Sequence, residues 1–268
     1  MKEISIKEIQ ELQLRLMRIV HKVCCEHDIK YYLISGSCLG AVRHGGFIPW
    51  DDDIDIAMMR PDYEKFISGF NAWFDTDAYF LQNEWTDLDF TVPLSRICIR
   101  GTMLEEPWAE HLRYDKSMFM DVFPLDNVPD DDTLRIKHDK AIKFYKSLIA
   151  RKVYTTTSNK IYNLAKWVIS KILKILPLSY LLKRRYKIHT KYAGENTRCV
   201  SSLASKYGYK KHIMSREIYG TPRLLQFENE EFYFPEKYTE HLVRLFGEKY
   251  MELPPVEKRE KPTTAYLI

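Results

Sequence analysis

Four carboxylates stand within five residues of one another, at Asp51, Asp52, Asp53 and Asp55. Carboxylates packed this closely repel one another unless a hard cation or a shared proton relieves the repulsion. Asp53 and Asp55 are separated by one apolar residue, which is the alternation of a half-buried strand, so both are expected on the same face. This spacing predicts two carboxylates that bind Mg²⁺, or Mn²⁺ in its place.

A further carboxylate, Asp121, interrupts the short apolar run at 118–126. Burying its charge costs several kcal/mol unless a metal or a cationic partner compensates it. We therefore predict that Asp121 is a third metal ligand or a general base. Asp126 is followed by Asn-Val-Pro and fits better as a structural residue that caps a turn.

A phosphate-binding segment is predicted directly before the acidic cluster. Gly36 and Ser37 follow an apolar strand at 31–34, and a tight turn there would offer backbone N–H groups and the Ser37 hydroxyl to a phosphate. Arg43 and His44 would either balance the phosphate charge or form salt bridges with the acidic cluster.

The elements that must position these residues have recognisable boundaries. Ser5 and Glu8 form a capping box that begins a long amphipathic helix, and Pro61 lies in the first turn of another. A strand predicted over residues 90–100 carries Arg96 and Arg100, which either reach phosphates or are exposed.

The C-terminal part predicts a hairpin at 227–235 and a helix at 238–250. After Pro255 the chain is expected to be poorly ordered.

Composition narrows the class of protein. The chain has 268 residues, enough for one large domain or two small ones. Its five cysteines are scattered without a CxxC pair, which argues against a disulfide framework and a zinc site and favours a reducing compartment. The first residues show no secretory signal, so a cytoplasmic protein is expected.

Positive charge is concentrated in one stretch. Residues 140–194 hold 14 Lys and Arg and no Asp or Glu, whereas the rest of the chain has 27 basic and 37 acidic residues. This stretch predicts a polyanionic partner, and its amphipathic part at 161–187 is typical of a helix lying on an anionic membrane. A core helix with a solvated basic side explains the same pattern.

The string Gly-Ala-Val-Arg-His-Gly-Gly-Phe-Ile-Pro-Trp-Asp-Asp-Asp-Ile-Asp-Ile at 40–56 resembles the LicD family. This family includes bacterial phosphocholine transferases and, more distantly, fukutin-related phosphoribitol transferases. The resemblance continues at 120–126 and at 246–255, where Phe-Gly-Glu-Lys-Tyr replaces the Tyr-Gly-Asp-Tyr common in the family, and no His pair follows Arg259. Substrate contacts made by that pair elsewhere must be made differently here.

The resemblance implies an α/β (α+β) nucleotidyltransferase fold, with a mixed sheet flanked by helices, a helical basic insertion and a C-terminal α+β segment. We place the catalytic core at 1–135, the basic helical segment at 136–194 and a segment that completes the substrate site at 195–268. The implied reaction is Mg²⁺-dependent transfer of phosphocholine from CDP-choline to a sugar hydroxyl of a teichoic acid or lipopolysaccharide precursor, with release of CMP.

The resemblance also suggests roles for the remaining candidates. Asp51 or Asp52 would ligate a second metal or bind a sugar hydroxyl, and a quaternary ammonium would need an aromatic cage, for which Trp50, Trp85 and Trp108 are candidates. The acceptor would be a polyprenyl-linked glycan, which brings the enzyme to the inner face of the cell membrane through residues 140–194. No nucleic-acid partner is then expected.

Three other interpretations share the same residues. A different CDP-linked donor would deliver ribitol phosphate or glycerol phosphate, and a true nucleotidyltransferase would release pyrophosphate. A third is a lipid- or nucleic-acid-binding protein without activity, in which the repulsion among Asp53, Asp55 and Asp121 would destabilise the fold without serving catalysis.

Overall fold

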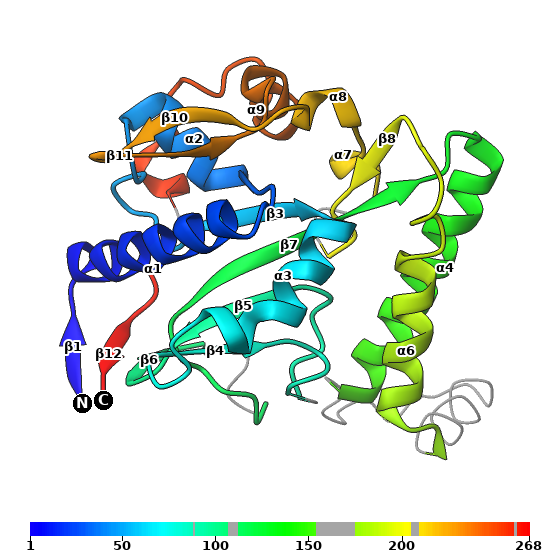
Figure 1. Ribbon diagram of the computed structural model, residues 1–268, viewed down its shortest axis with the longest axis horizontal. Helices are drawn as coiled ribbons and strands as arrows, with labels where there is room; N and C mark the ends of the chain where they lie inside the picture. Colours follow the sequence, from blue (N-terminus) through cyan, green and yellow to red (C-terminus); the bar gives the residue numbers. More distant parts are fainter. Residues whose placement is uncertain (88, 107–111, 154–174, 205–208, 260–261) are drawn as a thin grey trace.

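A mixed seven-stranded sheet forms the centre of the protein (Figure 1), whose computed structural model describes all residues except 88, 107–111, 154–174, 205–208 and 260–261. Strands β2, β3, β7, β5 and β4 are neighbours in that order, and β8 and β9 extend the sheet beside the last part of β7. Strands β3 and β7 are parallel, and the other neighbours are antiparallel. The predicted mixed sheet flanked by helices is confirmed. Its strands are β2 (Tyr32–Leu33), β3 (Asp55–Met59), β4 (Tyr79–Gln82), β5 (Ser95–Ile99), β7 (Phe119–Val128), β8 (Cys199–Ser201) and β9 (Met214–Ser215).

Helix α1 begins as the capping box predicts. The Ser5 hydroxyl accepts from the Glu8 N–H at 3.3 Å, and the Glu8 carboxylate accepts from the Ser5 N–H at 2.8 Å. The apolar face of the helix, including Leu16 and Val20, is fully buried in the main core. The helices are α1 (Ile6–Glu26), α2 (Ser35–His44), α3 (Arg60–Trp73), α4 (Asp132–Val153), α6 (Leu178–His189), α7 (Tyr209–His212), α8 (Arg216–Tyr219) and α9 (Tyr238–Phe246).

The two ends of the chain meet in a small second sheet (Figure 1). Strand β12 (Ala265–Leu267) pairs with both β1 (Lys2–Ile4) and β6 (Thr102–Leu104), and a short 3-10 helix, η2 (Val256–Lys258), precedes it. The expectation of a poorly ordered tail is therefore wrong. Pairing on both edges satisfies the backbone groups of β12, a gain that the polar sequence of the tail does not reveal.

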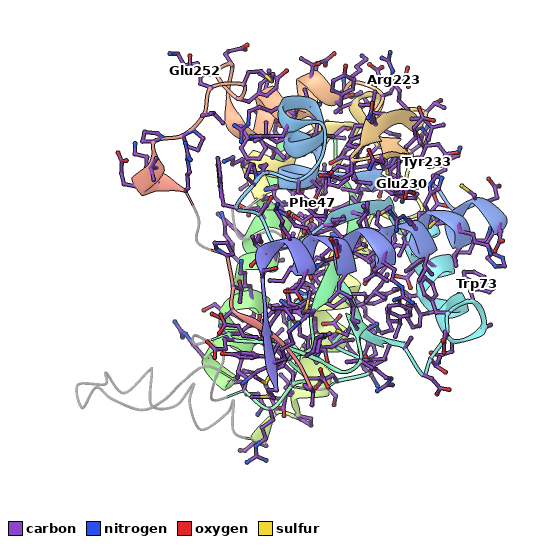
Figure 2. All side chains as sticks on the ribbon, turned by 90° about the vertical axis from the view of Figure 1, so that its left-hand side faces the viewer. Phe47, Trp73, Arg223, Glu230, Tyr233 and Glu252 are labelled. Carbon is purple, nitrogen blue, oxygen red and sulfur yellow. The ribbon has the colours of Figure 1, made fainter. Side chains whose placement is uncertain are left out.

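The predicted hairpin is confirmed as β10 (Arg223–Phe227) and β11 (Glu230–Phe234). It turns at Glu228, whose φ is +55°. The hairpin packs on the N-terminal half of the chain, because Phe227 meets the Phe47 ring edge-on at 4.9 Å and Glu230 forms an ion pair with Arg18 of α1. Figure 2 labels Phe47 and Glu230 on this side of the molecule.

Three predicted boundaries shift. Strand β3 begins at Asp55 rather than Asp53, although the predicted alternation holds, since Ile54 and Ile56 are buried and the neighbouring aspartates are half-buried. Strand β5 is shorter than the predicted 90–100. Helix α9 ends early because Gly247 takes a φ of +85°, a conformation that terminates helices.

Helices α4 and α6 pack side by side at one end of the sheet (Figure 1). Arg185 of α6 forms a buried ion pair with Glu84, and Tyr186 donates to Glu64 of α3 at 3.1 Å. Within the described ranges, no helix combines the length and the apolar character needed to cross a bilayer. The predicted amphipathic helix from residue 161 falls mainly on 154–174, outside those ranges.

Candidate active site

Gly36 and Ser37 lie in the first turn of α2, so the backbone N–H groups predicted in a tight turn or at a helix start belong to a helix start. The Ser37 hydroxyl accepts from the backbone N–H of Asp55 at 2.9 Å, which ties the start of α2 to the start of β3. A Cβ on Gly36 would lie only 2.8 Å from Oδ2 of Asp51. Glycine therefore allows the Asp51 carboxylate to approach the positive, N-terminal end of the helix.

The carboxylates of Asp51, Asp52 and Asp53 converge. Each contributes an oxygen atom within 4.8 Å of the others, and all three side chains are half-buried. Helix α1 holds their backbone, because the Gln10 side chain donates to the Asp51 carbonyl at 2.9 Å and that of Gln13 donates to the Asp52 carbonyl at 3.4 Å. The negative charges are thus held close together by the fold.

Asp55 and Asp121 are register partners on the parallel strands β3 and β7. Neighbouring strands lie about 4.8 Å apart, so the backbones of Asp55 and Asp121 are adjacent, and Asp53 precedes Asp55 by two residues. Among the described residues, Asp53 shares its close carboxylate cluster with Asp51 and Asp52, and Asp121 is not part of that cluster.

Arg96 of β5 is the cation that faces Asp121. Its Nε donates to Asp121 Oδ1 at 3.2 Å, its Nη2 lies 3.6 Å from Oε1 of Glu106, and its guanidinium lies 3.4 Å from the centre of the Phe119 ring. The side chain is buried, and Nη1 has no hydrogen-bond partner among the residues that the structure describes. Of the two alternatives for Arg96, exposure is thus wrong, whereas Arg100 is exposed and donates to the Thr76 carbonyl.

Burial sets the electrostatics of this pair. It raises the pKa of the Asp121 carboxyl, and Arg96 opposes this shift by stabilising the carboxylate. Burial by itself would lower the pKa of the Arg96 guanidinium, but Asp121 and Glu106 raise it above its usual range. Arg96 is therefore a permanent positive charge that fixes the orientation of Asp121.

Arg43 and His44 lie at the other end of α2, about 10 Å along the helix from Gly36 and Ser37. Arg43 Nη1 donates to the carbonyls of Tyr250 at 3.0 Å and Glu252 at 3.2 Å. These contacts tie α2 to the C-terminal segment. Burial, together with Arg43, lowers the pKa of His44.

The tryptophans proposed for an aromatic cage have separate surroundings. Trp50 packs edge-on against His44 and carries the Arg259 guanidinium 4.4 Å from its ring centre. Trp85 instead packs against Tyr186 of α6. Trp108 lies outside the described residues.

Asp126 is structural, but it does not cap a turn. It lies within β7, is 1% exposed, and accepts from Nε and Nη2 of Arg60 at 2.7 Å each. Sequence reasoning assigned it to a local turn because its partner is 66 residues away in the chain.

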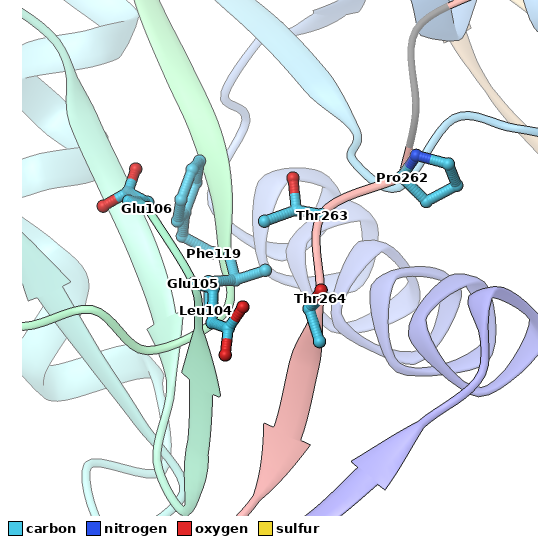
Figure 3. A pocket seen from close by; sticks show the side chains of 7 residues that line it. All are labelled: Leu104, Glu105, Glu106, Phe119, Pro262, Thr263 and Thr264. Carbon is cyan, nitrogen blue, oxygen red and sulfur yellow. The ribbon is translucent and has the colours of Figure 1, made fainter. Parts of the chain in front are cut away.

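The C-terminal tail contributes residues to the site that the sequence did not indicate. The backbone N–H of Thr263 donates to the Asp52 carboxylate across 211 residues of chain. Next to this bond lies a cavity of about 330 Å³ (Figure 3). It is lined by Leu104, Glu105, Glu106, Phe119, Pro262, Thr263 and Thr264.

Comparison with known proteins finds similarity to one family over much of the chain. The family model for the LicD/FKTN/FKRP nucleotidyltransferase domain matches residues 28–156, a range that contains the acidic cluster, Arg96 and Asp121. Lipopolysaccharide cholinephosphotransferase LicD of Haemophilus influenzae is 29% identical over 269 residues, which cover 98% of this chain and 97% of that protein.

Two further similarities are local or weak. Human ribitol 5-phosphate transferase FKRP is 50% identical over 34 residues, which are 13% of this chain and 7% of that protein. The structure of terminal uridylyl transferase 4 from Trypanosoma brucei with bound GTP aligns with 53% of this chain and 40% of that chain, at 12% sequence identity. Its TM-score of 0.23 is too low to support any conclusion. The family model and the end-to-end similarity to LicD agree with the motifs at 40–56 and 120–126, and residues 28–156 match a LicD-type nucleotidyltransferase domain.

Proposed function

We propose that this protein is a phosphotransferase that moves phosphocholine from CDP-choline to a sugar hydroxyl of a lipopolysaccharide or teichoic acid precursor and releases CMP. One observation carries the proposal: Asp55 and Asp121 are register partners beside the converging carboxylates of Asp51, Asp52 and Asp53. The end-to-end similarity to a lipopolysaccharide cholinephosphotransferase supports the choice of transferred group.

The donor set fits a divalent metal. Carboxylate oxygens are the ligands that Mg²⁺ and Mn²⁺ prefer, and Asp53, Asp55 and Asp121 would hold the ion. When bound, the ion neutralises charge on the diphosphate of the donor.

The residues of this chain account for the remaining requirements of phosphoryl transfer, which are positioning and proton removal. The backbone N–H groups of Gly36 and Ser37, at the start of α2, bind a donor phosphate, and Asp51 or Asp52 binds a sugar hydroxyl. Asp121 accepts the proton of the acceptor hydroxyl, whose oxygen forms a bond to the phosphorus of phosphocholine while the bond between that phosphorus and the CMP oxygen breaks.

Arg43, His44 and Trp50 contribute through the C-terminal segment. Their contacts with Tyr250, Glu252 and Arg259 close the far end of α2. We assign them to the part of the substrate site more distant from the acidic cluster.

A second donor is also favoured by an observation. The 34 residues that are 50% identical to ribitol 5-phosphate transferase FKRP would suit transfer of ribitol phosphate from a CDP-linked donor. The two donors share the metal site and differ only in the alcohol that the phosphate carries.

Product analysis tests the proposal. The full chain is incubated with Mg²⁺ and CDP-choline, CDP-ribitol or CTP plus phosphocholine, with water or a panel of glycosides as acceptor, and nucleotide products are separated. We expect CMP from CDP-choline, loss of at least 100-fold of that activity in Asp53→Ala, and unchanged activity in the exposed control Asp77→Ala. Release of pyrophosphate from CTP, or equal activity in Asp53→Ala, would contradict the proposal.

The acceptor and the location follow from the same proposal. A polyprenyl-linked glycan places the enzyme in the cytoplasm at the inner face of the cell membrane, and residues 140–194 would contact anionic lipid. Of this stretch, the structure describes part of α4, where Lys140, Lys143 and Lys146 are exposed and Phe144 is 57% exposed, and all of α6. Lys166, Lys171 and Lys174, which belong to the same stretch, lie outside the described residues.

A further inference from the structure

The cavity in Figure 3 lies at the start of β7, where Phe119 is the first residue of the strand. Phe119 and Asp121 are two residues apart on β7, so their side chains project from the same face, about 6.7 Å apart along the strand. Phe119 lines the cavity, and Asp121 belongs to the proposed metal site. A group attached to the reacting phosphorus would thus extend naturally toward Phe119.

The length of the transferred group matches this spacing. In phosphocholine, four covalent bonds of about 1.5 Å separate the phosphorus from the ammonium nitrogen, a span of about 5 Å. A phosphate held at Asp121 therefore places the trimethylammonium against Phe119. The volume of about 330 Å³ lies in the range of small-molecule sites.

The lining is suited to a cation with an apolar surface. Its two ionisable residues, Glu105 and Glu106, are both acidic, and Leu104, Phe119 and Pro262 are apolar. A quaternary ammonium donates no hydrogen bonds and is recognised by aromatic rings and nearby negative charge. Thr263 and Thr264 complete the lining.

Arg96 does not reverse this charge. Its guanidinium already lies against the Phe119 ring, and it is opposed by both Asp121 and Glu106. The net charge of this group of three is therefore negative. Glu105 adds a further negative charge, and its contact with the Tyr266 hydroxyl at 2.8 Å fixes its orientation.

The walls of the cavity are held by backbone bonds. The Glu105 N–H donates to the Thr264 carbonyl at 2.9 Å, β6 pairs with β12, and the Thr263 N–H binds Asp52. The cavity is thus built jointly by the catalytic core and the C-terminal tail.

From this geometry we propose that the cavity bounded by Glu105, Glu106, Phe119 and Thr263 binds the quaternary ammonium of the transferred group and makes the enzyme selective for a cationic alcohol phosphate. The inference rests on the proposed phosphotransferase activity and goes beyond it by assigning the specificity of the donor to named residues. It assigns to Phe119 the role that the sequence suggested for the tryptophans.

Donor discrimination tests the inference. Turnover is measured with CDP-choline and with its uncharged isostere CDP-3,3-dimethylbutanol, in wild type, Phe119→Leu and Glu105→Gln. Two matched controls are used. In Phe80→Leu, the replaced ring lies 4.7 Å from the Arg100 guanidinium and does not line the cavity, and in Glu231→Gln the replaced side chain is exposed. We expect each cavity variant to lose about tenfold in kcat/KM for CDP-choline and less than about twofold for the isostere, with both controls unchanged.

Because Phe119 also contacts Arg96, its replacement could disturb Asp121 and slow both donors equally, whereas Glu105 has no such contact among the described residues. Equal loss for the two donors in both variants, or no loss in either, would overturn the inference while leaving the phosphotransferase proposal intact.

A binding experiment separates the two proposals. Isothermal titration calorimetry compares phosphocholine with the phosphate ester of 3,3-dimethylbutanol in the presence of Mg²⁺. If wild type releases no CMP from CDP-choline, the proposed activity fails, but tighter binding of phosphocholine that is lost in Glu105→Gln still supports the cation site. Equal binding of the two esters, or no binding of either, refutes the cation site independently of turnover.

Discussion

Replacing Asp126 by asparagine should destabilise the protein without removing its chemistry. The substitution leaves the Arg60 guanidinium, which is 8% exposed, without the carboxylate that accepts its two 2.7 Å bonds. Removing one partner of a buried ion pair costs about 3–5 kcal/mol. Glu64 still lies 3.0 Å from Arg60 Nη1, so we expect the lower end of this range, about 3 kcal/mol.

Such a loss is measurable by two methods. Urea unfolding followed by tryptophan fluorescence should show a lower midpoint with an unchanged slope. At about 2–4 °C per kcal/mol for a chain of this size, the melting temperature should fall by about 6–12 °C. At a temperature where both proteins are folded, kcat should stay within about twofold of wild type.

Asp121→Asn is the matched control, because the same substitution is made five residues earlier on the same strand. Arg96 keeps Glu106 at 3.6 Å, so its loss of stability should be smaller, whereas turnover should fall by about 10²–10⁴-fold. An Asp126→Asn protein that unfolds within about 0.5 kcal/mol of wild type would refute the assignment of a buried ion pair. An inactive but fully stable Asp126→Asn protein would refute the division of roles between the two aspartates.

Three further predictions concern acid stability, membrane contact and the orientation of Asp121. Burial lowers the pKa of His241 to about 3, whereas the unfolded chain titrates near 6.5, so its contribution to stability is complete above pH 6.5 and is lost as the pH falls toward 3. In urea unfolding, His241 should account for about 2–3 kcal/mol of the stability lost between pH 7.5 and pH 4.5, and a His241→Gln protein that loses as much stability as wild type over this pH range would contradict this. Reversing the exposed Lys140 and Lys146 of α4 to Glu should weaken sedimentation with phosphatidylglycerol vesicles at least tenfold, while neutral vesicles serve as the control; unchanged sedimentation would rule out membrane contact through these two residues. Arg96→Lys, which cannot reproduce the planar contacts of a guanidinium, should lower kcat at least tenfold with little change in KM, and a change in KM alone would assign Arg96 to substrate binding instead.

Features set by residues close together in the chain could be predicted from the sequence. The capping box at Ser5 and Glu8 started α1, and the alternation at 53–56 matched the observed burial even though β3 begins two residues later. The apolar run around Asp121 indicated that a metal or a cationic partner must compensate its charge, and Arg96, 25 residues earlier in the chain, is a cationic partner. The capping box and the alternation are encoded by neighbouring residues, whereas the identity of this partner is not.

Contacts between distant residues could not be predicted in this way. Thr263 reaches Asp52 across 211 residues, and Gln13 reaches the Phe119 carbonyl across 106. Asp126 was misassigned for the same reason, because a turn signal lay beside it and its true partner lay far away. The cavity beside Phe119 is lined by residues just before β12, a three-residue strand whose stability comes from its two neighbours rather than from its own sequence.

The location of a bound metal ion tests the central claim most directly. Crystals grown with Mn²⁺ and CDP-choline are measured at a wavelength where manganese scatters anomalously. The account predicts an anomalous peak about 2.1 Å from carboxylate oxygens of Asp53, Asp55 and Asp121. A peak bound by Asp51 and Asp52 without Asp121, or no peak at a Mn²⁺ concentration that supports turnover, would contradict it.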